Sequence, residues 1–292
     1  MNKTILVTGA DGQLGQELQL LSKNYPYDFI FSNRHMLDIT DNQKVDLFFE
    51  HNKIDIIINC AAYTAVDMAE KNQEQAYAIN YTAVEKLAKI AKQYSIKLIH
   101  ISTDYVFDGK NYKPYCEEDM PNPCGVYSTS KYLGEQSLIN INPRNSIILR
   151  SSWIYSPFGR NFLKTILRLT NENKTLKIVF DQIGTPTYGK DLAGTILDIL
   201  PKINNQSVEL FHYSNEGIAS WYDFAKEILD IHGLSNAIIP IETIEYPTPV
   251  KRPHFSVLNK SKIKKTFGVT IPHWKDSLKE CLQKKIIMAC SI

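Results

Sequence analysis

The most constraining feature of this sequence is the stretch that opens it. An apolar run over Thr4–Thr8 is typical of a buried parallel strand, and it stops at a glycine. The pattern Gly-x-x-Gly-x-x-Gly follows at Gly9, Gly12 and Gly15, and regularly spaced leucines then mark one face of a helix. Small residues let a backbone approach a pyrophosphate, and a helix N-terminus presents free N–H groups and a positive dipole end. This order predicts a dinucleotide site, whereas a plain tight turn would hold the same glycines without a ligand.

The remainder of the first half alternates strand and helix patterns. Apolar runs predict four further strands, at Asp28–Ser32, Ile54–Asn59, Lys97–Ser102 and Ser146–Arg150. Helices are expected between them, over Asp41–His51 with Asp41 as N-cap, and over Gln73–Asn80, Tyr81–Tyr94 and Val126–Ile139. This alternation predicts an α/β fold with a doubly wound parallel sheet, the Rossmann arrangement. The pattern then loosens, with helices expected near Asn161–Thr170, Lys190–Leu200, Ser220–His232 and Trp274–Ile287.

Composition and charge exclude several classes of protein. The chain has 292 residues, of which 43% are apolar and 22% charged, as is ordinary for a globular protein. A net charge of +2 creates no general field for nucleic acid or an acidic membrane, and no run reaches the roughly 20 apolar residues of a membrane span. The five cysteines form no Cys-x-x-Cys pair, so neither a disulfide framework nor a zinc site is expected. We therefore expect a cytoplasmic protein with no nucleic acid and no membrane among its partners.

Tyr127 and Lys131 are the leading candidates for chemistry. They are four residues apart in a helical pattern, so their side chains would lie on one face, roughly 6 Å apart. A cation beside a phenol favours the phenolate and lowers the tyrosine pKa from about 10. Tyr127 is thus predicted to donate and accept a proton, although two solvated helix residues would show the same spacing. Thr103 ends a predicted strand, where a hydroxyl could reach a bound carbonyl.

Two charged residues near the end of the second strand bear on the cofactor. The adenosine ribose of a dinucleotide usually lies at this end, and Arg34 stands there in place of an acid. An arginine could meet a 2′-phosphate, which favours NADPH, with NADH as the alternative. An exposed loop arginine explains the residue equally well. Asp38 could touch the adenine or the ribose.

The motifs together resemble a known family. The glycine turn, Ser102-Thr103-Asp104 and Tyr127-x-x-x-Lys131 are similar to the signature of the extended short-chain dehydrogenases/reductases. More narrowly, segments 12–15, 59–67, 102–109, 150–153 and 181–187 resemble those of the dTDP-4-dehydrorhamnose reductase family, and the resemblance covers nearly the whole chain. It implies a dinucleotide-binding domain of residues 1–149 with about 182–214 and 254–273. A smaller, discontinuous C-terminal nucleotide-sugar domain would hold about 150–181, 215–253 and 274–292.

The resemblance implies roles for individual residues. Gly15, Arg34 and Arg252 are added to them from the sequence patterns themselves. The catalytic residues would be Thr103, Tyr127 and Lys131. The cofactor would contact Gly9, Gly12, Gln13, Leu14, Gly15, Arg34, Asp38, Ile39, Ala62, Tyr63, Thr64, Tyr127 and Lys131. The substrate would contact Val66, Thr103, Asp104, Tyr105, Tyr127, Trp153 and Arg252.

Two of these substrate contacts have structural alternatives. Trp153 directly follows a strand end, where a sugar ring could stack on it, and core packing is the other interpretation. Arg252 could meet the dTDP diphosphate because arginine suits bidentate phosphate contacts, but an exposed loop cation fits as well. Another aromatic residue, Trp221, begins an apolar stripe at helical spacing and is expected to pack in the core.

The resemblance implies an activity. It is reduction of the 4-keto group of dTDP-6-deoxy-L-lyxo-4-hexulose to dTDP-L-rhamnose by NADPH, with Tyr127 as proton donor, Thr103 orienting the carbonyl and Lys131 lowering the tyrosine pKa. One alternative is a reductase or epimerase of another nucleotide-linked 4-keto sugar. The other is a non-catalytic regulatory subunit that binds dinucleotide.

Magnesium and a homodimer are linked in this family. Some relatives bind Mg²⁺ between subunits through glutamates, and Glu17 and Glu280 fall near two such positions. Lys190 falls where a further acid is expected, so no metal ligand is assigned and the dimer built around the metal is left open.

Overall fold

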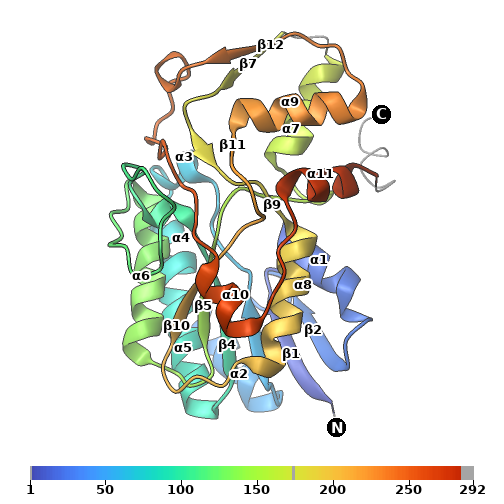
Figure 1. Cartoon of the computed structure of the whole chain (residues 1–292). Coiled ribbons are helices and arrows are strands. Elements are labelled where there is room, and N and C mark those ends of the chain that lie inside the picture. Colours follow the sequence, from blue (N-terminus) through green and yellow to red (C-terminus); the bar gives the residue numbers. More distant parts are fainter. Residues whose placement is uncertain (1, 173–174, 284–292) are drawn as a thin grey trace.

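A six-stranded parallel sheet carries the first part of the chain (Figure 1). The computed structural model describes residues 2–172 and 175–283. The strand order is β10-β5-β4-β3-β1-β2, and the bounds are β1 (Lys3–Thr8), β2 (Tyr27–Ser32), β3 (Ile56–Asn59), β4 (Lys97–Thr103), β5 (Ile147–Ser151) and β10 (Glu209–Tyr213). The chain runs outward from β1 to β2 and returns on the other side of β1 as β3. Such a reversal opens a crevice at the carboxyl ends of the strands, where open α/β sheets bind ligands.

Alternating side chains cover both faces of this sheet. Ile5 and Val7 of β1 join one apolar cluster, with α1 (Gln13–Ser22) and α8 (Gly189–Ile199), whereas Leu6 joins the opposite one. That second face is covered by α2 (Asn42–His51), α5 (Ala83–Tyr94) and α6 (Val126–Ile141), and Figure 1 shows the two sets of helices on either side of the sheet. The doubly wound α/β fold is therefore confirmed. The edge strand β10 escaped prediction.

The two helices expected over 73–94 form one continuous helical run. After α3 (Val66–Ala69) the chain passes through α4 (Gln73–Tyr77), a π-helical turn η1 (Ala78–Thr82) and α5. The π turn buries Asn80, whose side chain accepts from the Tyr63 N–H at 2.9 Å and donates to the Tyr63 carbonyl at 3.1 Å. The irregular turn thus fastens the loop that follows β3, and π turns often occur at functional sites.

A second group of elements lies beyond the carboxyl ends of the strands, at the top of Figure 1. The helices are α7 (Phe162–Asn171), α9 (Trp221–His232) and α11 (Trp274–Gln283). Short strand pairs join them: β6 (Ile154–Tyr155) with β9 (Thr187–Tyr188), β7 (Leu176–Val179) with β12 (Ile238–Ile241), and β8 (Ile183–Gly184) with β11 (Ala219–Ser220). The helix α10 (Ser261–Phe267) lies lower, beside β10, where Ile263 and Phe267 join the apolar cluster of the sheet (Figure 1). The described residues also form three 3₁₀ turns: η2 (Asp104–Val106), η3 (Leu200–Lys202) and η4 (Thr243–Glu245).

This second group has an apolar cluster of its own. Phe224, Leu163 and Leu278 pack there, from α9, α7 and α11. Ser220 and Asp223 form the expected capping box at the start of α9, and Asp41 caps α2 as predicted. The separate cluster supports a second domain, whose boundaries stay a prediction, and the part of the expected last helix beyond Gln283 lies outside the described residues. Within residues 2–172 and 175–283, no helix is both long and apolar enough to cross a membrane.

Candidate active site

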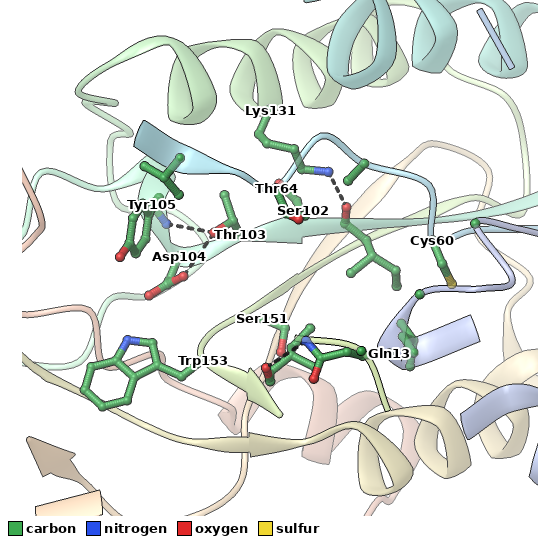
Figure 2. Close-up of a pocket in the computed structure, with 18 of the residues that line it drawn as sticks. Gln13, Cys60, Thr64, Ser102, Thr103, Asp104, Tyr105, Lys131, Ser151 and Trp153 are labelled. Carbon is green, nitrogen blue, oxygen red and sulfur yellow. Dashed lines mark hydrogen bonds between the residues drawn. The ribbon is translucent and has the colours of Figure 1, made fainter. Parts of the chain in front are cut away.

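A pocket of about 500 Å³ opens where the sheet strands end. Figure 2 shows Lys131 and Trp153 entering it from opposite sides, with Thr103 and Asp104 between them. Most of the predicted site residues line this pocket: Gly9, Gly12, Gln13, Leu14, Gly15, Ala62, Thr64, Val66, Thr103, Asp104, Tyr105, Tyr127, Lys131 and Trp153. Residues from the glycine turn, three further strand ends and α6 therefore converge as the sequence predicts.

The glycine turn has the shape of an anion cradle. Gly9 has φ +67°, and a Cβ there would lie 2.7 Å from the backbone of Ala61. A Cβ on Gly15 would lie 2.6 Å from the Gly9 carbonyl oxygen, so the turn and the helix pack too closely for side chains. Gly12 is the N-cap of α1, and no side chain among the described residues caps that helix. Its first N–H groups therefore suit a pyrophosphate, as a dinucleotide requires.

Tyr127 and Thr103 meet in the pocket. Burial raises the pKa of the Tyr127 phenol to about 12, a hydrogen bond with Thr103 acts in the opposite direction, and Asp104 raises it further. The ring of Tyr105 packs edge-on against Tyr127, with centroids 5.9 Å apart. A tyrosine with this pKa is protonated at neutral pH, which suits a proton donor.

The structure does not bear out the prediction that Lys131 lowers the pKa of Tyr127. The Lys131 ammonium donates to the Ile101 carbonyl at 2.6 Å, and the side chain is only 2% exposed. Burial lowers the pKa of Lys131 to about 8, with Glu135 acting against it. Desolvation of the phenol therefore outweighs any help from a neighbouring cation that is itself desolvated and already bound.

Asp104 is a buried carboxyl beside the reacting groups. The Thr103 hydroxyl donates to Asp104 Oδ1 at 3.0 Å and accepts from the Tyr105 N–H at 3.2 Å. Burial raises the pKa of Asp104 to about 7, against the effect of hydrogen bonds from Ser256 and Thr103. The pocket thus holds a carboxyl group that titrates near neutral pH.

This titration predicts a pH-dependent difference in stability. At a pH between the ordinary aspartate pKa and about 7, the folded protein binds a proton at Asp104 that the unfolded chain lacks. The contribution of Asp104 to the free energy of unfolding therefore falls as pH rises through this window. Asparagine does not titrate, so as the pH rises through that window the variant Asp104→Asn should become more stable relative to the parent, by at most about 1.4 kcal/mol per pH unit. Buried His100 and His212, whose pKa values are lowered, act oppositely but are common to both proteins. Thermal midpoints of the two proteins at about pH 5 and about pH 8 test this, and a constant difference contradicts it.

The residues expected near the adenosine lie outside the pocket lining. Arg34 and Asp38 form an ion pair at 3.0 Å on the loop after β2, where the Arg34 side chain is 67% exposed. Ile39 is buried, and Tyr63 holds Asn80 through its backbone. The structure therefore places Arg34 and Asp38 on the loop after β2 and Tyr63 on the loop after β3, all outside the pocket lining.

Arg252 is a buried cation rather than an exposed one. Its Nη2 donates to Asp67 Oδ2 at 2.7 Å, and its side chain is 15% exposed. It lines a small neighbouring pocket, whose wall includes Tyr105 of the main pocket. Its Nη1 has no hydrogen-bond partner among the described residues. The alternative of a plain exposed loop arginine is therefore wrong.

Trp221 packs against the apolar cluster of the second group, as predicted, and its partly buried ring also lines the pocket, which was not predicted. It is the first residue of α9, and its ring stacks on that of Trp153 with centroids 3.5 Å apart and planes 9° apart. The later residues of the stripe, Phe224 and Ile228, do pack in the core. Trp221 stands at the edge of this cluster, so one part of its ring packs inward while another lines the pocket, and helical spacing alone does not indicate that second role.

Other lining residues were also missed. These are Cys60, Ile101, Ser102, Ser151, Ile154, Gly159 and Arg160. Cys60 and Ser151 stand at strand ends, so the rule that ligands bind there could have found them. Gly159 and Arg160 come from a loop, and only the fold brings them to the glycine turn, where Asn161 donates to the Gln13 side chain at 2.8 Å.

The position that is relevant to magnesium does not suit a divalent cation. Lys190 forms an ion pair with Glu280. An ammonium group at that place repels a metal ion and already binds one carboxylate that could serve as a ligand. Across the described part of the chain, no three His, Cys, Asp or Glu side chains gather as metal ligands.

Comparison with known proteins identifies the family of this chain. Residues 2–287 match the RmlD substrate binding domain family. A dTDP-4-dehydrorhamnose reductase from Aggregatibacter actinomycetemcomitans is 40% identical over 94% of this chain and 97% of its own. The chain belongs to the dTDP-4-dehydrorhamnose reductase family. The family expected from the motifs is thus confirmed.

Two further relatives extend the comparison. The spore coat polysaccharide biosynthesis protein SpsK of Bacillus subtilis is 42% identical over 96% of this chain and 97% of its own. The crystal structure of dTDP-4-dehydrorhamnose reductase from Bacillus anthracis, in complex with NADP, has a TM-score of 0.92 at 35% identity and covers 97% of this chain and 99% of that one. The fold is therefore shared along nearly the whole chain with a protein that binds NADP.

Proposed function

We propose that the chain reduces the 4-keto group of dTDP-6-deoxy-L-lyxo-4-hexulose to dTDP-L-rhamnose with NADPH. The observation that carries this proposal is the convergence of the glycine turn, Thr103, Tyr127 and Lys131 on one pocket at the strand ends. Family membership supports the same chemistry. The retained trio also argues against a non-catalytic regulatory subunit.

The residues of the pocket have different roles in the reduction. NADPH, when bound at the glycine turn, supplies the hydride that reduces the carbonyl carbon. Thr103 can hydrogen-bond the carbonyl oxygen, and Tyr127 can give a proton to the alkoxide that develops there. An alkoxide is more basic than a phenolate, so this transfer is favourable even from a tyrosine whose pKa is about 12. A positioned donor of this kind typically lowers a barrier by a few kcal/mol.

Arg34 supports NADPH over NADH. It stands at the end of β2 with most of its side chain exposed, and only one edge of its guanidinium is held by Asp38. The other N–H groups of this exposed guanidinium can turn toward a 2′-phosphate, a group that arginine binds well. The NADP bound by the Bacillus anthracis relative agrees with this choice. A homodimer and a cytoplasmic location stay predictions.

The decisive test is an assay of the purified protein. NADPH oxidation is followed at the cofactor absorbance with dTDP-6-deoxy-L-lyxo-4-hexulose, with NADH and a UDP-linked 4-keto sugar in parallel. We expect turnover with NADPH and the dTDP sugar, and a lower kcat/KM in both parallel reactions. Preference for the UDP sugar would favour the alternative reductase or epimerase, and no oxidation with any keto sugar would reject the proposal.

Arg252 yields a prediction on nucleotide binding. Its guanidinium has one edge on Asp67, and its buried Nη1 has no partner among the described residues, so this donor could bind a diphosphate once a small movement exposes it. Charge-assisted hydrogen bonds contribute roughly 1.5–3 kcal/mol, so Arg252→Ala should weaken dTDP binding by about tenfold or more. Calorimetric titration with dTDP measures this, and exposed Lys251→Ala is the matched control. Unchanged affinity in the Arg252 variant would remove this contact.

A further inference from the structure

Trp153 is held in an unusual backbone conformation at the pocket wall. Its φ is +47°, in the left-handed region that a bulky residue rarely adopts. Strained residues of this kind persist only where the surrounding structure holds them, and they cluster at ligand sites. The Trp153 carbonyl accepts from the Thr187 N–H at 3.1 Å, which fixes the backbone. The ring still needs support of its own, because Trp153 is only half-buried.

Two neighbours supply that support. The indole lies so close to Gly184 of β8 that a Cβ there would be 2.6 Å from ring atom Cε2. Trp221 stacks in parallel on the same indole, and Phe162 packs on Trp221 with centroids 4.6 Å apart. β8 pairs with β11, which leads directly into Trp221, so Gly184 and Trp221 belong to one local unit. The wall formed by Trp153 therefore depends on the second group of elements.

We infer that Trp221 is a positioning residue, which holds the Trp153 indole in place for the sugar and so sets affinity for the substrate. Trp221 covers one face of Trp153, and the sugar can meet only the surface that remains. This inference rests on the proposed function and adds to it a residue that acts through Trp153. Thr103 and Tyr127 come from β4 and α6, so the reacting groups do not depend on this stack.

A double-mutant cycle tests the inference. The proteins are the parent, Trp153→Ala, Trp221→Ala, the double variant and the conservative Trp221→Phe. Aromatic pairs contribute roughly 0.5–1.5 kcal/mol, so Trp221→Ala should raise the KM for the keto sugar about threefold to tenfold. The kcat and the KM for NADPH should stay within about twofold of the parent, because neither the proton donor nor the glycine turn is touched. Trp221→Phe, which keeps an aromatic ring, should restore most of the affinity.

Non-additivity separates positioning from direct contact. If Trp221 acts through Trp153, Trp221→Ala should add little to KM in the Trp153→Ala background. Additive effects on KM, or an unchanged KM in Trp221→Ala, would overturn the inference. So would a fall in kcat at constant KM, since it would place Trp221 in the chemistry.

Near-ultraviolet circular dichroism gives a readout that is independent of turnover. The chain has three tryptophans, and the third, Trp274, packs in the cluster of the second group of elements. The bands of the stacked pair should be lost equally in Trp153→Ala and Trp221→Ala and kept in Trp274→Phe. Bands that survive in Trp221→Ala would reject the positioning role. Absence of turnover in the parent would reject the proposed function instead, while the spectra still report whether the two rings depend on each other.

Discussion

Replacing Tyr127 by phenylalanine is expected to lower kcat by about 10²- to 10⁴-fold, the usual contribution of a positioned proton donor. The variant lacks only the phenolic hydroxyl, and Tyr127 lines the same pocket as Thr103. The glycine turn and the first turn of α1 are unchanged, so NADPH affinity should stay within about twofold, and the loss should appear in the chemical step. Single-turnover oxidation of NADPH together with a fluorescence titration of NADPH separates the two quantities.

Tyr132 offers a matched control on the same helix. Its side chain packs against the small apolar cluster formed by Val106, Phe107, Tyr115 and Leu258, and it does not line the pocket. The variant Tyr132→Phe should therefore retain kcat. Near-normal turnover in Tyr127→Phe would remove Tyr127 as the acid, and equal losses in both variants would indicate damage to α6 instead.

The buried ion pair between Glu135 and Arg150 is the second place where a large effect is expected. Arg150 donates from Nε and Nη2 to the two carboxylate oxygens at 2.9 and 2.7 Å, and the side chains are 2% and 0% exposed. The Ser102 hydroxyl also donates to Glu135, and the guanidinium lies 5.0 Å from the centre of the Phe107 ring. Glu135 therefore joins the ends of β4 and β5 beneath the catalytic residues.

Removal of one partner leaves a charge that is buried and unpaired. Glu135→Ala should lower the free energy of unfolding by about 3–5 kcal/mol, as is typical when a buried pair is broken. Asp230→Asn, which breaks the exposed pair between Lys226 and Asp230, should change it by less than about 1 kcal/mol. Denaturant unfolding of both variants measures the difference. If both variants lost a similarly small free energy of unfolding, water or rearrangement would be compensating the unpaired charge of Arg150. The ion pair would then not stabilise the ends of β4 and β5.

Local features of the fold were predictable because short-range chemistry decides them. The strand at Thr4–Thr8, the glycine turn and the leucine stripe of α1 need only neighbours within a few residues. The caps at Asp41 and Ser220 follow in the same way, since a side-chain oxygen meets an N–H three residues on. The strand-end rule then placed Thr103 and Ala62 in the pocket without any knowledge of distances.

Other features depended on residues far apart in the chain. The π turn over Ala78–Thr82 turns Asn80 toward the Tyr63 backbone, and neither spacing nor composition indicates that irregularity. The Arg252 guanidinium is paired with Asp67, which lies 185 positions away in sequence. The stack of Trp153 on Trp221 likewise joins two segments whose patterns show no relation to each other.

The sequence by itself determined the alternating strands and helices of the first half, the glycine turn and the identity of the catalytic candidates, because hydrophobic period and cap chemistry act between near neighbours. Only the tertiary structure decided the electrostatics. The pKa of Tyr127 rises and that of Lys131 falls because the folded chain removes both groups from water and gives the ammonium to the Ile101 carbonyl. Desolvation depends on everything packed around a group, and that surrounding is assembled from segments distant in sequence.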